Sequence, residues 1–191
     1  MLILASASPR RQELLRNAGI EFRVHASSVE EGFRNGESAT DCALRLAQEK
    51  AVSVSRLFRL DVVLGADTLV VVDGIMLGKP SAAPDAAQML RLLSGRTHEV
   101  VTGVCLVGPL NGERAGDRTV KTAAETTRVS MTAFSERDIT DYVATGEPMD
   151  KAGAYAIQGI AARWIPRIEG DYSNVVGLPV ALVWKMLKEF R

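Results

Sequence analysis

Residues 2–11 read Leu2-Ile3-Leu4-Ala5-Ser6-Ala7-Ser8-Pro9-Arg10-Arg11 and join a short apolar run to the start of a helix. The apolar run Leu2 to Ala5 predicts a short buried strand. Ser8 followed by Pro9 is typical of a helix N-terminus, with serine at the N-cap and proline in the first turn. Gly19 predicts the end of that helix. A strand that leads directly into a helix favours a fold that mixes the two.

The rest of the chain alternates helical and strand patterns, with no low-complexity tract and no linker. Apolar residues at helical spacing predict helices over about 40–58 and 85–93, from 136 to a stop at Gly146, and after Pro179. Strands are predicted at 22–26, 62–67, 68–72, 75–77, 98–107, 119–130 and 164–168, with an Asn-Gly turn inside a loop over 108–117. We therefore expect one domain, residues 1–191, of mixed α/β (α+β) class, with a long twisted mixed sheet flanked by helices.

Composition narrows the classes of function. Lys plus Arg and Asp plus Glu each number 23, so the net charge is zero and no overall positive field favours nucleic acid or acidic membranes. No run approaches the roughly 20 apolar residues that span a bilayer. Cys42 and Cys105 form no CxxC pattern, which fits a reducing compartment. We expect a cytoplasmic protein with no membrane contact and no stable nucleic-acid partner.

The 191 residues include only two histidines, His25 and His98, and neither has a partner pattern typical of a metal ligand. We expect structural roles for both, so acid–base chemistry falls to carboxylates. Trp164, Trp184 and Tyr155 lie at spacings that predict core packing without chemistry.

Two arginines occupy the first turn of the helix that follows Ser8. A helix N-terminus carries partial positive charge, so Arg10 and Arg11 each oppose the helix dipole by about 0.3–1 kcal/mol. One interpretation is an anion that docks against these side chains and the free backbone N–H groups. In the other, both arginines turn into solvent or pair with acids such as Glu13. The motif alone leaves both open.

A carboxylate, Asp67, ends the apolar stretch 62–66. A carboxylate there is costly unless it meets a cation, a metal or a reacting water; alternatively it caps the following turn. Lys50 is expected on a solvated helix face. Lys79 lies in a Gly-Lys-Pro segment that lacks the spacing of a P-loop but can bind phosphate as a point charge. The pair Glu30-Glu31 either binds a divalent cation or forms an acidic surface loop.

Gln158 stands in a glycine-flanked segment, where its amide can either read the edge of a base or tie down a turn.

Five blocks, in order, resemble the Maf family of nucleotide pyrophosphatases, and together they cover essentially the whole chain. They are Ser6 to Leu15; Gly65-Ala66-Asp67-Thr68 with Gly78-Lys79-Pro80; Leu93 to His98 with Thr102-Gly103-Val104; Glu147 to Gly159; and Gly170-Asp171-Tyr172 with Val176-Gly177-Leu178-Pro179. Ala156 and Met149 depart from the family pattern, and both are conservative in bulk.

The resemblance implies a fold like that of the inosine triphosphate pyrophosphatases, with two lobes around a cleft. It implies hydrolysis of a nucleoside triphosphate between the α and β phosphorus, giving a monophosphate and pyrophosphate, with a divalent cation (Mg²⁺ or Mn²⁺). A homodimer is also suggested by it. The alternative is a non-catalytic nucleotide or nucleic-acid binding regulator of septum formation. A purely structural protein would leave the first-turn arginines unexplained.

Residue roles also follow from the resemblance. Asp67 would accept the proton of water, and Glu31 would help to place the metal. The triphosphate would be held by Ser8, Arg11, Lys50 and Lys79. At Arg10, Thr68 and Gln158, the positions that influence base choice, the sequence is similar to the branch directed at dTTP and UTP rather than to that directed at 7-methylguanosine triphosphate.

Overall fold

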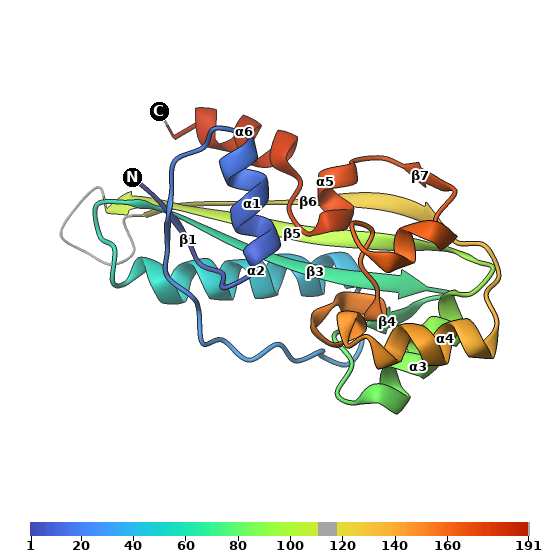
Figure 1. Ribbon diagram of the computed structural model, residues 1–191. Coiled ribbons are helices and arrows are strands. Elements are labelled where there is room, and N and C mark those ends of the chain that lie inside the picture. The colour runs from blue at the N-terminus through green and yellow to red at the C-terminus, as the bar shows by residue number, and fades with distance from the viewer. Residues whose placement is uncertain (111–117, 191) are drawn as a thin grey trace. The chain divides into compact units, whose positions relative to one another are not determined.

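The structure is a computed structural model that describes residues 1–110 and 118–190, and its chain forms two compact units (Figure 1). Unit 1 consists of Met1–Asp67, Thr102–Glu125 and Gly177–Arg191, and unit 2 of Thr68–Val101 and Thr126–Val176. Two units agree with the two expected lobes. The predicted Asn-Gly turn at residues 111–112 lies outside the described residues.

The described residues form a seven-stranded sheet in the order β2-β1-β3-β5-β6-β7, with β4 paired to β3. β1 pairs in parallel with β2 and β3, whereas β4 on β3 and β7 on β6 are antiparallel, so the predicted mixed sheet is confirmed. The strands are β1 (Leu2–Leu4), β2 (Arg23–Val24), β3 (Val62–Val72), β4 (Ile75–Leu77), β5 (Thr97–Leu110), β6 (Arg118–Ser130) and β7 (Arg167–Glu169).

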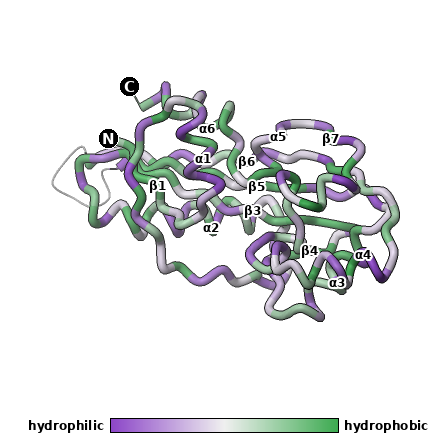
Figure 2. Tube along the Cα trace, viewed as in Figure 1, coloured by the Kyte–Doolittle hydropathy of each residue, from purple (hydrophilic) through white to green (hydrophobic). Residues whose placement is uncertain are grey.

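Unit 1 has three layers. Its helices are α1 (Pro9–Asn17), α2 (Ala39–Ser55) and α6 (Val180–Lys188), and α2 runs along one face of its strands (Figure 1). Strand side chains point alternately to the two faces. Leu2 and Leu4 pack in one apolar cluster with residues of α1 and α6, whereas Ile3 packs in another with α2. Figure 2 shows hydrophobic colour along β3 and β5. The strands of unit 1 therefore bury both faces.

Glycines bring α2 unusually close to the sheet of unit 1. A Cβ atom added to Gly65 on β3 would lie 2.2 Å from the carbonyl oxygen of Ala47 and 2.8 Å from the amide nitrogen of Ala51. One on Gly103 of β5 would lie 2.2 Å from the carbonyl oxygen of Ala43. Because these neighbours are backbone atoms of α2, no side chain can move aside to make room.

Unit 2 packs helices on the strands around a separate apolar core that includes Val70, Val72, Leu90, Tyr142 and Trp164. Ser135 caps α4 with Asp138 in a capping box. The helices of unit 2 are α3 (Ala83–Leu93), α4 (Glu136–Ala144) and α5 (Tyr172–Val176), with the 3-10 helices η1 (Glu147–Asp150), η2 (Ala152–Ala154) and η3 (Ile160–Trp164).

Several sequence-based boundaries were wrong. The predicted helix 40–58 ends at Ser55, because Leu57 and Phe58 donate to carbonyls three residues back and tighten the chain into a turn. The loop expected from 108 begins later, since β5 continues to Leu110. Trp164, expected at the start of a strand, belongs to η3, and β7 begins at Arg167.

The three aromatic residues that were predicted to pack in the core differ in their burial. Tyr155 and Trp164 are buried as predicted, but Trp184 is 40% exposed, with the ammonium of Lys188 5.4 Å from its ring centroid. Trp184 lies between Val183 and Met186, the two buried residues of α6, and points away from the core face of that helix. None of the helices in the described residues is long and apolar enough to cross a membrane.

The contact between Gly65 and α2 predicts a strong response to one methyl group. We expect Gly65→Ala to lower the free energy of unfolding by about 1–3 kcal/mol, because the backbone of α2 must shift. Gly32→Ala is the control, since an added Cβ there meets nothing within 4 Å, and it should change stability by less than about 0.5 kcal/mol. Urea unfolding measures both, and equal stabilities of the two variants would contradict the packing described.

Burial of His98 predicts acid sensitivity. Its Nε2 lies 2.7 Å from the hydroxyl of Tyr155, and burial lowers its pKa to about 4. An unfolded chain takes up this proton near pH 6.5, whereas the folded chain does not until about pH 4, so stability must fall as pH drops through this window. We expect a loss approaching about 3 kcal/mol in urea unfolding. His98→Gln should flatten the dependence and His25→Gln should keep it; a wild-type stability constant from pH 6.5 to 4.5 would disprove this.

Candidate functional site

Asp67 lies inside β3 rather than at the end of a strand as predicted, because the chain stays extended through Thr68 to Val72. Leu64 and Ala66 pack in the cluster with α1 and α6, whereas Val63 packs against α2. Alternation along the strand therefore turns Asp67 toward α2. Its side chain is 7% exposed. A carboxylate this buried requires a counter-charge.

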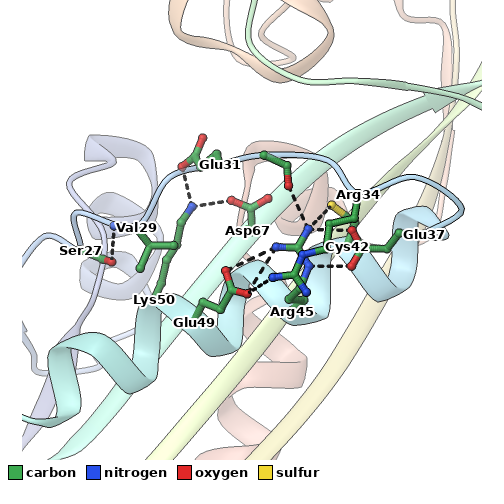
Figure 3. Close-up of polar contacts among 11 residues, drawn as sticks. Ser27, Val29, Glu31, Arg34, Glu37, Cys42, Arg45, Glu49, Lys50 and Asp67 are labelled. Atoms are coloured by element: carbon green, nitrogen blue, oxygen red, sulfur yellow. Dashed lines mark hydrogen bonds and ion pairs between the residues drawn. The ribbon is translucent and has the colours of Figure 1, made fainter.

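Lys50 of α2 supplies that counter-charge. Its ammonium lies 2.5 Å from Oδ1 of Asp67 and 2.5 Å from Oε1 of Glu31, and its side chain is 7% exposed (Figure 3). The solvated position expected for Lys50 was therefore wrong. Lys50 lies three residues after Ala47 and four before Val54, both buried on the sheet side of α2, so helical spacing places it on the same face. One buried cation joins two carboxylates.

Arg11 of α1 is buried beside this pair. Its Nε donates to the carbonyl of Gly177 at 2.8 Å, and its Nη1 donates to the carbonyl of Ala66 at 2.9 Å and to Oγ of Ser6 at 3.2 Å. Burial lowers the pKa of this guanidinium, while the charges of Asp67 and Glu31 oppose that shift. Arg11 therefore does not turn into solvent. It adds a positive charge next to the residue that precedes Asp67.

The start of α1 is positively charged, as its two arginines predict. Ser8 stands at the N-cap, but its side chain makes no capping hydrogen bond, and its backbone N–H donates to Oγ of Ser6 at 3.2 Å. No acidic residue lies in the first turn of α1. Arg10 is half-buried there. The helix N-terminus thus combines its partial positive charge with two guanidinium groups, an arrangement that suits an anion.

The loop before α2 carries Glu31 and is tied to the helix. Arg45 donates from Nε and Nη2 to the two carboxylate oxygens of Glu37, each at 2.7 Å, and from Nη2 to the carbonyl of Gly32 at 2.9 Å (Figure 3). This fork lowers the pKa of Glu37 to about 2. Sequence reasoning missed the pair, since residues 37 and 45 lie outside helical spacing and only the fold brings them together.

Both cysteines are free, buried thiols. Burial and the neighbouring Glu37 raise the pKa of Cys42 to about 11, and burial raises that of Cys105 to about 12. Nη2 of Arg45 lies 3.6 Å from Sγ of Cys42.

The remaining predicted site residues belong to unit 2. Thr68 is half-buried on β3, Lys79 is exposed after β4, and Gln158 is exposed between η2 and η3. A backbone hydrogen bond of 3.0 Å from Gly153 to Gly78 ties the segment before Lys79 to η2. These positions do not test the roles of Thr68, Lys79 and Gln158, which stay predictions.

The turn that carries Gln158 is held by Glu147, which sequence reasoning also missed. The carboxylate of Glu147 accepts the hydroxyl of Tyr142 at 2.8 Å and the backbone N–H of Ile160 at 3.0 Å. A Cβ on Gly159 would lie 2.2 Å from that carboxylate, so the turn needs glycine there. The position of Glu147 inside the fourth motif block was the available signal.

The two carboxylates that meet at Lys50 are suitable ligands for a hard divalent cation. Carboxylate oxygens of Glu31 and Asp67 converge on one cationic centre, and Mg²⁺ is commonly held by one or two carboxylates together with substrate phosphates. The described residues contain no cluster of three or more His, Cys, Asp or Glu side chains that could hold a metal by themselves. A metal here would therefore depend on ligands from a bound substrate.

Comparisons with known proteins agree on one family. A family model described as Maf-like protein matches residues 1–190. The chain is 55% identical over 187 residues to a Koribacter versatilis protein named dTTP/UTP pyrophosphatase, covering 98% of this chain and 93% of that protein. A Geotalea uraniireducens protein of the same name is 51% identical with the same coverage.

The solved structure of the Staphylococcus aureus Ham1 protein has 14% sequence identity and a TM-score of 0.52, covering 100% of this chain and 99% of that one. At this identity the likeness concerns the fold alone, and it confirms the predicted fold class.

The buried cation between two carboxylates predicts a test of stability. Lys50→Met would leave the carboxylate of Asp67 buried without its partner, so we expect a loss of about 3–5 kcal/mol in urea unfolding. Lys50→Met/Asp67→Asn should recover much of that loss because it removes the stranded charge. Lys121→Met is the control, since its pair with Glu189 is exposed and should matter far less. A double variant less stable than Lys50→Met would refute this account.

Proposed function

Since the chain belongs to the Maf-like protein family, we propose that it is an enzyme that hydrolyses dTTP and UTP to the nucleoside monophosphate and pyrophosphate. The relatives at 55% and 51% identity carry the name dTTP/UTP pyrophosphatase. The observation that carries the proposal is the group formed by buried Asp67 and Lys50 and half-exposed Glu31, with buried Arg11 beside it. Two carboxylates and two cations gathered in this way suit the cleavage of a polyanion by water.

Asp67 is proposed as the general base. A base must lie within hydrogen-bond reach of the water that attacks, and this carboxylate is held in one position by Lys50. The neighbouring cations of Lys50 and Arg11 supply positive charge where the triphosphate accumulates negative charge.

Ser8, Arg11, Lys50 and Lys79 are proposed to hold the triphosphate, as the resemblance implies. The hydroxyl of Ser8 makes no capping bond within α1 and can donate to a phosphate oxygen. The ammonium of Lys50 has three donors, so it can bind a phosphate oxygen while it still holds Asp67. Arg10, Thr68 and Gln158 are proposed to influence the choice of base, as the resemblance implies.

Glu31 and Asp67 are the residues that would hold a divalent cation, Mg²⁺ or Mn²⁺. Such an ion supplies charge neutralisation for the triphosphate and its pyrophosphate product. Glu31 reaches the group from the loop and is 40% exposed, whereas Asp67 is fixed on β3. A homodimer is likewise proposed on the resemblance, and a cytoplasmic location on the cysteine pattern. The alternative, a non-catalytic regulator of septum formation, is favoured by nothing in the described residues.

A substrate panel tests the proposal. With Mg²⁺ or Mn²⁺, dTTP and UTP should give monophosphate plus pyrophosphate, separated by ion-exchange chromatography. Asp67→Asn should lower kcat by about 10²–10⁴-fold, because the base is lost. Asp61→Asn is the matched control, since Asp61 pairs with the N-terminal amine and lies outside the site. Diphosphate plus orthophosphate as products, or full activity of Asp67→Asn, would contradict the assignment.

A further inference from the structure

The loop that carries Glu31 is fastened to α2 on both sides of that residue. Before it, Oγ of Ser27 lies 3.1 Å from Oγ of Ser53 on α2. After it, Arg45 of α2 binds the carbonyl of Gly32 at 2.9 Å and Glu37 through two bonds of 2.7 Å. Glu31 therefore lies between two anchor points on one helix. The second anchor begins one peptide bond away from it.

The second anchor is the stronger of the two. A forked bond between a guanidinium and a carboxylate is charge-assisted and fixes direction as well as distance. The side chains of Arg45 and Glu37 are only 15% and 12% exposed, so water competes weakly with the pair. Arg34, the other arginine of this region, is 64% exposed and pairs with Glu49. Arg45 alone of the two reaches the backbone next to Glu31.

Arg45 and Lys50 lie on the same helix, and the helix fixes their separation. Lys50 holds Asp67 and Glu31, and Arg45 holds the loop that presents Glu31. Figure 3 shows both side chains leaving α2 toward the loop. Without Arg45 the loop would keep its link at Ser27, but nothing equivalent would fix the backbone directly after Glu31.

We propose that Arg45 is a positioning residue, which holds the Glu31 carboxylate near Asp67 so that the two can share a divalent cation. The inference rests on the proposed function for the role of that cation. An arginine suits the task better than a lysine, because only a planar fork can bind a carboxylate through two bonds and also reach a carbonyl. Residues that orient metal ligands typically change metal affinity by about 10–100-fold when removed.

The test compares Arg45→Gln with Arg34→Ala, an arginine variant in the same loop region that leaves Gly32 and Glu37 untouched. Arg45→Gln should raise the Mn²⁺ concentration for half-maximal dTTP hydrolysis by at least about tenfold, with kcat recovering at saturating Mn²⁺. Arg45→Lys should fall between wild type and Arg45→Gln. The double variant Glu37→Gln/Arg45→Gln should need no more Mn²⁺ than Arg45→Gln, because both substitutions break the same contact. An unchanged Mn²⁺ requirement in Arg45→Gln, or an equal shift in Arg34→Ala, would overturn the proposal.

Two further measurements separate this inference from the proposed activity. Mn²⁺ binding in the presence of a non-hydrolysable dTTP analogue, followed by electron paramagnetic resonance, should be weaker in Arg45→Gln, and amide exchange over residues 29–37 should be faster. Both apply even if wild type hydrolyses no triphosphate, in which case the proposed function fails alone. Equal Mn²⁺ binding by wild type and Arg45→Gln, including no binding by either, overturns the positioning role, as does unchanged amide exchange.

Discussion

The candidate site depends on the contacts that the buried ammonium of Lys50 makes with two carboxylates. It contacts Asp67 and Glu31 at 2.5 Å each, and both it and Asp67 are almost fully shielded from water. Burying charges is costly, and attraction within the group offsets that cost only when every member has a partner. The arrangement therefore keeps opposite charges paired in a place from which water is largely excluded.

The geometry of unit 1 follows from the close approach of α2 to its strands. Gly65 and Gly103 present bare backbone to Ala47 and Ala43, so the helix lies nearer to the sheet than ordinary side chains would permit. This closeness lets a lysine on the helix reach a carboxylate two residues beyond Gly65 on β3. Packing and chemistry thus share one requirement, which is the absence of a Cβ at position 65.

Much of this fold could be predicted from patterns that are local in the chain. The strand–helix junction around Ser8 is confirmed because it depends on residues a few positions apart, and the mixed sheet is confirmed because each strand has its own local pattern of apolar residues. The partners of Lys50 could not be predicted, since a lone lysine is usually solvated and its carboxylates lie 17 and 19 residues away. The contact of Arg45 with Glu37 was missed for a related reason, because a loop and not a helical turn brings them together. Lys79, Thr68 and Gln158 rest on family resemblance, and their roles stay predictions.

The state of the two thiols has a consequence for redox chemistry. Peroxides and alkylating reagents attack the thiolate, and groups with a pKa of about 11 and about 12 are almost entirely protonated at neutral pH. Cys42 lies against the guanidinium of Arg45, but its burial leaves the thiol unreactive. A molecule whose two sulfhydryls are both buried in this way should resist thiol oxidation and alkylation while it stays folded.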